Sequence, residues 1–240
     1  MTEFALNPSL DARALADHYA TRRRIHIPEL LVDAHAEQLA RCLEAEVPWG
    51  FAWFDGTEPR YHRAEALRAL TREAQQSLHK EIFQVAGSGF QYAYRTYPML
   101  DAYLQGWGQV PLLDRLLDFI NSPTMLEFVG QVTGHADIAR GDAQATCFGP
   151  GHFLKFHDDA QEDDRIAAFV MNFTRRWHPD WGGYLQFYDE RMDIEEAFLP
   201  RFNALNMFSV PQHHSVSYVA NYAAGQRYSV TGWFRRARQG

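Results

Sequence analysis

Hydrophobic positions in the first half of the chain recur at helical spacing. Ser9 can cap a helix that runs to about Arg22, and residues 25–27 are typical of a short strand. Asp33 can cap a second helix, in which Leu39 and neighbouring apolar residues share one face. Near-helical spacing also predicts helices over three later segments, 63–83, 110–120 and 123–133.

The pattern changes near residue 137, where short runs rich in β-branched and aromatic residues begin to follow one another. Glycine, proline, asparagine or aspartate separates most of these runs. Several short strands at this spacing indicate a β-sandwich or barrel, so we expect helices packed outside a β-rich core. The expected strands are 143–148, 166–173, 184–188, 204–210, 215–219 and 228–234.

Segment 89–107 is unusually aromatic. One interpretation is a core strand followed by an aromatic loop, and the other is a lid that contacts a substrate, with Tyr97, Tyr103 and Trp107 as the contact residues. The aromatic residues of the segment are Phe90, Tyr92, Tyr94, Tyr97, Tyr103 and Trp107.

Composition narrows the class of protein. A chain of 240 residues can form one sizeable domain, and its net charge of -7 argues against a nucleic-acid-binding face. Cys42 and Cys147 give no disulfide framework, which favours a reducing, cytoplasmic location. Residues 1–8 lack a signal-peptide pattern, and no apolar run is long enough for a membrane span.

Three His-x-Asp sequences are candidates for a metal site. A mononuclear iron site needs two histidines and one carboxylate on one side of the metal, and a His-x-Asp on a strand presents both side chains on one face. The sequences at 135–137 and 178–180 lie at a helix end and in a turn-rich connector. His157 instead ends a strand-like run and is followed by Asp159, so this pair is favoured.

The third ligand must come from a distant strand, and His213 and His214 are the candidates. Adjacent residues of a strand face opposite sides, so only one of them can point inward. His214 alternates with Val216, which favours His214 modestly and leaves His213 open.

Arg227 shares one strand face with Ser229 and Thr231. A guanidinium binds a carboxylate through two parallel hydrogen bonds, and neighbouring hydroxyls can add donors. This face therefore suits a bound dicarboxylate. The alternative is an arginine on an edge strand, exposed to water.

Taken in order, these motifs resemble the prolyl-hydroxylase-like branch of the 2-oxoglutarate/Fe(II) oxygenases. The resemblance covers roughly residues 143–235. The matching sequences are GPGHFL (149–154), HDD (157–159), RIA (165–167), W (177), GGYL (182–185), NALNMF (203–208), HSV (214–216) and RYSVTGWF (227–234).

The resemblance implies a double-stranded β-helix, or jelly-roll, with N-terminal helices outside it. It implies Fe(II), 2-oxoglutarate and O2 as cofactor and cosubstrates, and an association with L-ascorbic acid. By the same resemblance His157, Asp159 and His214 bind iron, Arg227 binds the distal carboxylate of 2-oxoglutarate, and the remaining cosubstrate-binding residues are Ser229, Thr231, Asn172 and Leu154.

Two positions depart from the family pattern. Tyrosines that commonly help to hold the cosubstrate are replaced here by Asn172 and Phe148. Ser229 or Thr231 could supply the missing hydroxyl group.

The implied activity is hydroxylation of a protein prolyl residue, with the translation machinery as a candidate substrate, and a single domain over 1–240 is expected. Residues 1–136 would form a helical support and lid, and 137–236 the core. A free amino acid or small metabolite is an alternative substrate. A non-catalytic metal- or ligand-binding jelly-roll and a zinc hydrolase are alternatives of other classes, although zinc chemistry would have no use for a buried Arg227. No nucleic-acid or membrane partner is expected.

Overall fold

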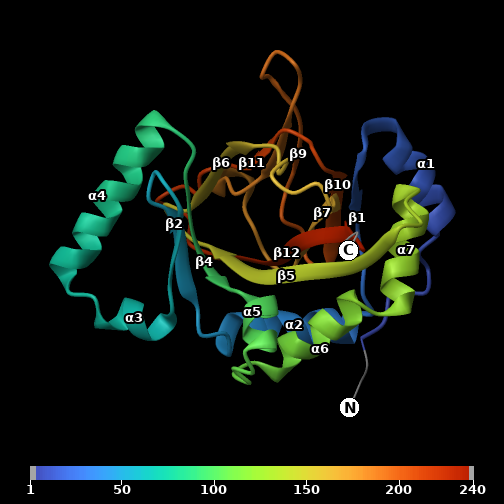
Figure 1. Cartoon of the computed structure of the whole chain (residues 1–240), viewed down its shortest axis with the longest axis horizontal. Helices are drawn as coiled ribbons and strands as arrows, with labels where there is room; N and C mark the ends of the chain where they lie inside the picture. Colours follow the sequence, from blue (N-terminus) through green and yellow to red (C-terminus); the bar gives the residue numbers. More distant parts are fainter. Residues whose placement is uncertain (1–3, 238–240) are drawn as a thin grey trace.

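The N-terminal half of the described residues combines helices with four strands. The computed structural model describes residues 4–237. In Figure 1 the helices of this half lie below and to both sides of the central sheet. The elements are α1 (Ala12–Arg22), β1 (Arg24–Ile27), α2 (Asp33–Ala45), β2 (Gly50–Phe54), β3 (Pro59–His62), α3 (Ala64–Ala69), α4 (Arg72–Ser88), β4 (Tyr92–Tyr97), α5 (Met99–Leu104), α6 (Pro111–Ile120) and α7 (Pro123–Thr133).

Most of the expected helices are present, with shifted ends. Asp11, rather than Ser9, caps α1, because its side chain accepts hydrogen bonds from two backbone amides of the first turn. Asp33 lies within the first turn of α2, after Val32. The helix expected over 63–83 is two helices, because Leu70 is extended and ends α3. The hydrophobic pattern did not indicate β2 and β3, which are short and partly exposed.

The C-terminal half is almost entirely β-structure, as expected. Its strands pair antiparallel, and the described residues form one twelve-stranded sheet in the order β1-β10-β7-β12-β5-β4-β6-β11-β8-β9, with β2 paired to β4 and β3 paired to β2. The elements are β5 (Ile138–Phe148), β6 (Phe153–His157), β7 (Arg165–Asn172), the 3₁₀ turn η1 (Pro179–Trp181), β8 (Leu185–Tyr188), β9 (Ile194–Phe198), β10 (Ala204–Ser209), β11 (His214–Val216) and β12 (Arg227–Arg236).

The strands curl into a jelly-roll, which confirms the expected fold class. In Figure 1, β6, β11 and β9 lie above β5 and β12. Segments that are distant in sequence thereby become neighbours: β12 pairs with both β5 and β7, and β11 pairs with both β6 and β8.

Alternation along β12 separates a helix-facing side from an interior side. Val230 and Phe234 belong to the main hydrophobic core, whereas Arg227, Ser229 and Thr231 line the interior cavity. This two-residue period is the expected geometry of a strand whose faces meet different surroundings.

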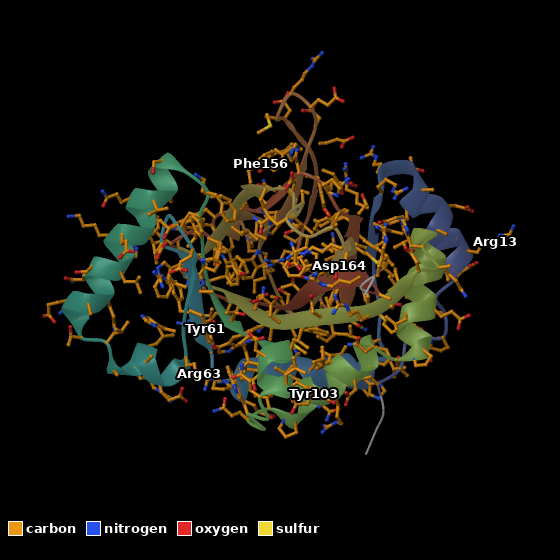
Figure 2. All side chains as sticks on the ribbon, viewed as in Figure 1. Arg13, Tyr61, Arg63, Tyr103, Phe156 and Asp164 are labelled. Carbon is orange, nitrogen blue, oxygen red and sulfur yellow. The ribbon has the colours of Figure 1, made fainter. Side chains whose placement is uncertain are left out.

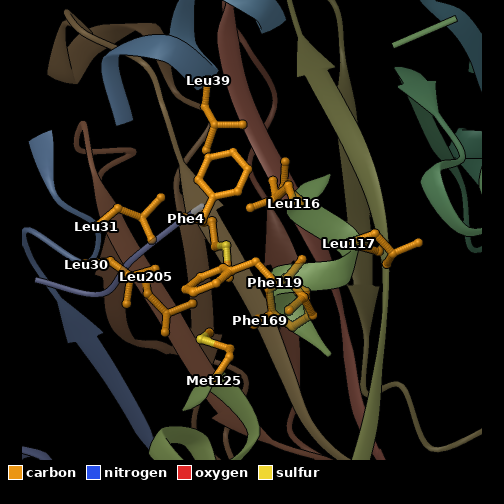
Figure 3. Close-up of a cluster of buried hydrophobic side chains, with 14 of the residues drawn as sticks. Phe4, Leu30, Leu31, Leu39, Leu116, Leu117, Phe119, Met125, Phe169 and Leu205 are labelled. Atoms are coloured by element: carbon orange, nitrogen blue, oxygen red, sulfur yellow. The ribbon is translucent and has the colours of Figure 1, made fainter. Parts of the chain in front are cut away.

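The main core lies between this sheet and the helices beneath it. Figure 3 shows side chains of this core, with Leu39 of α2 and Leu116 of α6 in the same cluster as Phe169 and Leu205 of the sheet. Burial of such side chains contributes roughly 1.5–3 kcal/mol each, so this layer anchors the sheet on one side and leaves the other free for a site. Figure 2 shows side chains filling most of the remaining space between the ribbons. None of the described helices is long and apolar enough to cross a membrane.

Candidate metal and dicarboxylate site

A cavity of about 550 Å³ lies inside the jelly-roll. Its walls combine the interior faces of β5, β7 and β12 with residues from β3, β4, β6 and β11. Four of the residues predicted from the sequence to be functional meet in it: His157, Asp159, His214 and Arg227.

His157, Asp159 and His214 form a cluster that could hold a metal ion. Their ligand atoms lie within 4.8 Å of one another. Nε2 of His157 is 3.5 Å from Oδ1 of Asp159, and Nε2 of His214 is 3.6 Å from Oδ2. Two imidazoles and one carboxylate on one side of a site are a donor set typical of non-haem Fe(II).

Backbone carbonyls fix both imidazole rings of this cluster. Nδ1 of His157 lies 2.9 Å from the Lys155 carbonyl oxygen, and Nδ1 of His214 lies 2.8 Å from the Gln212 carbonyl oxygen. A carbonyl can only accept, so each Nδ1 carries the proton and each Nε2 keeps its lone pair for a metal. Burial, together with a smaller contribution from the neighbouring His157, lowers the pKa of His214 to about 4, which favours the neutral ligand form.

Strand pairing places the two histidines together and separates the rival candidates from them. His214 is the register partner of His157, and the centroids of their rings are 4.1 Å apart. His213 is exposed and packs against Phe156 outside the cavity. The His-x-Asp sequences at 135–137 and 178–180 also lie outside the cluster.

Asp159 reaches the cluster in a different way from the one expected. Strand β6 ends at His157, and Asp159 follows it with a left-handed φ of 63°. The same-face rule for an extended strand therefore does not apply. A tight turn brings the carboxylate toward His157, in a conformation that few residues other than glycine, asparagine and aspartate tolerate.

Arg227 lines the same cavity and is only 2% exposed. Within residues 4–237, no carboxylate lies within 4.0 Å of it, and its Nε atom has no hydrogen-bond partner. Burial lowers the pKa of Arg227 to about 10. A buried charge without a partner is strongly unfavourable, so this guanidinium fits an anionic ligand.

The other predicted cosubstrate residues are only partly brought together. Ser229, Thr231 and Leu154 line the cavity, and the Ser229 hydroxyl lies 2.9 Å from the Thr146 hydroxyl. Asn172 is the register partner of Ser229 but does not line the cavity. Its Nδ2 atom lies 3.4 Å from the Val170 carbonyl oxygen, and its Oδ1 atom has no partner.

Phe90 and aromatic side chains of β4 form an aromatic wall that extends from His157 to Phe148 and Arg227. The ring centroids of Phe90 and His157 are 5.6 Å apart, and those of Tyr92 and Tyr94 are 5.5 Å apart. Tyr94 stacks on Phe148 with 4.8 Å between the ring centroids. The guanidinium of Arg227 lies 5.1 Å from the Phe148 ring. All four of these aromatic residues line the cavity.

The expectation that Tyr97, Tyr103 and Trp107 contact the substrate is wrong in its choice of residues. Tyr97 has the opposite strand parity to Tyr92 and belongs to the main core. Trp107 packs against that core, and Tyr103 is exposed on α5. None of the three lines the cavity.

Sequence reasoning missed Trp233 and Arg165, which flank the metal cluster. Nε1 of Trp233 donates to Oδ2 of Asp159 at 3.0 Å, and the Arg165 guanidinium lies 3.8 Å from the centre of the Trp233 ring. The parity of Trp233 with Arg227 was the available signal, since both must face the interior.

Comparison with known proteins agrees with this geometry. Residues 143–235 match the model of the 2OG-Fe(II) oxygenase superfamily. A prolyl 3-hydroxylase of Mus musculus, OGFOD1, is 35% identical over 88 residues, which are 34% of this chain and 16% of that protein. The match therefore spans about a sixth of the relative.

Solved structures share the fold over nearly the whole chain. A prolyl-4-hydroxylase of Pseudomonas putida has a TM-score of 0.59 at 17% identity and covers 95% of this chain and 100% of its own. A prolyl hydroxylase of Trichoplax adhaerens, solved with a hypoxia inducible factor peptide fragment, has a TM-score of 0.51 at 16% identity and covers 94% and 89%. Residues 143–235 therefore resemble the 2OG-Fe(II) oxygenase superfamily, a likeness that implies Fe(II), 2-oxoglutarate and O2, and the jelly-roll core and the His-Asp-His cluster agree with it.

Proposed function

We propose that this protein is an Fe(II)- and 2-oxoglutarate-dependent dioxygenase that hydroxylates a prolyl residue of a protein or peptide. The observation that carries the proposal is the presence, in one cavity, of a His-Asp-His cluster and a buried arginine without a carboxylate partner. The first suits Fe(II), and the second suits the distal carboxylate of 2-oxoglutarate.

In this proposal His157, Asp159 and His214 hold the iron, and Arg227 orients the cosubstrate. Fe(II) supplies the redox chemistry by which O2 and 2-oxoglutarate become succinate, CO2 and one oxygen atom inserted into a C–H bond. The fixed imidazoles present their Nε2 atoms without rearrangement. Ser229 and Thr231 add hydroxyl donors beside Arg227.

The charges in the cavity support a peptide substrate over a free amino acid. Arg60 pairs with Asp55 and Glu58, and Arg165 pairs with Glu162 at 2.6 Å. Among the described arginines and lysines that line the cavity, Arg227 alone lacks a carboxylate partner. If 2-oxoglutarate binds Arg227, no unpaired cation is left for the carboxylate of a free amino acid. A residue within a peptide has no free α-carboxylate and needs no such cation.

The aromatic wall supports a saturated ring as the reacting group. Phe90, Tyr92 and Tyr94 present ring faces and edges beside the metal cluster. Such surfaces bury an apolar ring favourably. The resemblance to the prolyl 3-hydroxylase and prolyl-4-hydroxylase named above agrees with this choice.

We also propose that the two halves of the chain act as one oxygenase domain. Strand β4 of the N-terminal half pairs with β5 and β6 of the C-terminal half. The cavity takes residues from both halves, so the N-terminal half contributes walls to the site as well as helical support.

The test measures succinate formation from 2-oxoglutarate with Fe(II) and O2, using prolyl peptides and free L-proline as substrates. We expect turnover to depend on iron and O2, and a peptide to gain one oxygen atom by mass spectrometry. Succinate formation that continues without O2 would contradict the oxygenase assignment. Stimulation by free proline alone would contradict the peptide assignment.

A matched pair of variants tests the metal ligands. His214→Ala should abolish turnover, as should His157→Ala and Asp159→Ala. His213→Ala changes the adjacent but outward-facing histidine and should keep most activity, as should His178→Ala. The reverse result for His213 and His214 would show that the distal ligand is assigned wrongly.

A further inference from the structure

We propose that Trp233 is a positioning residue of the metal site: its indole N–H holds the Asp159 carboxylate in the orientation in which it faces both imidazoles. This inference rests on the proposed function, because it assumes that the cluster binds a metal. It adds a residue that donates to a ligand and does not itself bind the metal.

Few side chains other than Trp233 hold the Asp159 carboxylate in place. In the described part of the chain, Trp233 Nε1 is the one side-chain donor within hydrogen-bond distance, at 3.0 Å from Oδ2. The two imidazole Nε2 atoms lie at 3.5 and 3.6 Å, and Arg165 Nη1 lies 3.8 Å from Oδ1. Without the indole, rotation of the carboxylate would meet little resistance.

The backbone of Asp159 is strained and therefore needs support from its surroundings. Its φ of 63° is left-handed, a conformation that persists where surrounding contacts over-determine it. Arg165 Nη1 donates to the Asp159 carbonyl oxygen at 3.2 Å. The same guanidinium lies 3.8 Å from the centre of the Trp233 ring, so one arginine supports both partners of the hydrogen bond.

Ion pairs near the indole hold Arg165 in place. Glu162 lies 2.6 Å from Arg165 and 2.7 Å from Arg235, which links the acidic loop after Asp159 to strand β12. The backbone N–H of Trp233 donates to Asp142 at 3.0 Å, which fixes the strand itself. The indole is therefore a rigid donor in a preorganised position.

The test is Co(II) binding to the purified chain in the absence of 2-oxoglutarate, measured by titration calorimetry and by the Co(II) absorption bands. Trp233→Phe keeps an aromatic ring under Arg165 but removes the N–H. Loss of a group that hydrogen-bonds to a metal ligand typically weakens metal binding roughly 10–100-fold, so we expect that loss together with shifted Co(II) bands.

Trp53→Phe is the matched control. Trp53 is also a buried tryptophan, but its indole nitrogen has no hydrogen-bond partner and it lies outside the cavity lining. This variant should bind Co(II) as the wild type does. A second variant, with benzothienylalanine at position 233, keeps the bicyclic shape and removes only the N–H, which separates the hydrogen bond from packing if Trp233→Phe folds poorly.

The outcomes separate this inference from the proposed function. Weaker Co(II) binding and altered bands in both position-233 variants, with an unchanged control, would support it. Wild-type affinity and bands in the benzothienylalanine variant would overturn it while leaving the metal site intact. A wild-type chain that binds no Co(II) would overturn the proposed function and this inference with it.

Discussion

Strand β12 carries a buried arginine at each end, and the two have opposite surroundings. Arg235 is 6% exposed and contacts three carboxylates, those of Asp142 at 2.6 Å, Glu162 at 2.7 Å and Asp164 at 2.6 Å. Arg227 is 2% exposed, and the described residues offer it no carboxylate.

The pKa values of the two arginines differ in direction for this reason. Burial lowers the pKa of Arg227 to about 10, with no partner to oppose it. Burial alone would also lower the pKa of Arg235, but hydrogen bonds and charge from Glu162 and Asp142 outweigh it, and the pKa is raised. Arg235 is thus a structural residue, whereas the surroundings of Arg227 are incomplete without an anion.

Of the two arginines, Arg227 gives the larger expected effect on function when replaced by methionine. Removing one partner of a buried ion pair costs roughly 3–5 kcal/mol, or about 10²–10⁴-fold in affinity. The concentration of 2-oxoglutarate for half-maximal succinate formation should rise by that factor, while Co(II) binding in the absence of 2-oxoglutarate stays at the wild-type level. An unchanged requirement for 2-oxoglutarate would mean that another basic residue holds its distal carboxylate.

Arg235→Met should destabilise the protein with little direct effect on the cavity. Its carboxylate partners are 19–45% exposed, so the free energy of unfolding should fall by about 2 kcal/mol, less than for a fully buried pair. Urea denaturation of the ligand-free protein measures this. Arg227→Met should be neutral or stabilising in the same experiment, because it removes a buried charge that lacks a partner.

Arg140→Met is the control for the stability measurement. Arg140 also pairs with Asp164, but its side chain is 39% exposed, so its loss should cost about 0.5 kcal/mol or less. Equal destabilisation by Arg227→Met and Arg235→Met would show that the two arginines do not differ in their contribution to stability.

The gain in stability on binding 2-oxoglutarate should also differ between the Arg227 and Arg235 variants. With Mn(II) in place of iron, 2-oxoglutarate at a hundred times its Kd should stabilise the wild type by about 2.7 kcal/mol. Arg235→Met should gain as much from its lower starting point. Arg227→Met should gain almost nothing at that concentration, and a wild-type gain in this variant would contradict the role of Arg227.

Thiol labelling gives the smallest expected effect. Burial raises the pKa of Cys42 and of Cys147 to about 12, so both stay protonated at pH 8 and react only when the structure opens. Cys147 is the register partner of Tyr228, beside Arg227. Added 2-oxoglutarate with Mn(II) should therefore slow the labelling of Cys147 by several-fold and that of Cys42, in α2, by less. Equal slowing would show that both thiols report global unfolding.

The pattern of the sequence predicted the β-rich core and the polar face of β12 for local reasons, and the resemblance to the 2-oxoglutarate/Fe(II) oxygenases implied the jelly-roll. The two-residue period of a strand places Arg227, Ser229 and Thr231 on one face whatever the strand packs against. The same period excludes one of His213 and His214 from the interior. The structure places His214 inward, as the alternation with Val216 indicated.

Other features depended on contacts that spacing along the chain does not reveal. The aromatic density of segment 89–107 did not show which rings face the cavity, because that depends on where β4 begins and ends. Asp159 meets His157 through a left-handed turn after the strand, although its spacing suggested an extended pair. Asn172, at a cosubstrate position by resemblance, does not line the cavity, because its place in the wall is set by its neighbours in the sheet.

Which faces of the strands are polar follows from the sequence, because alternation is a property of one strand. Which of the two buried arginines of β12 is neutralised depends on the tertiary structure. Arg235 meets Asp142, Glu162 and Asp164, which lie 71–93 residues earlier in the chain, whereas Arg227, on the same strand, meets none. Charge pairing depends on distances of a few ångströms between segments that sheet packing brings together, and this packing leaves Arg227 alone beside the cavity that holds the His-Asp-His cluster.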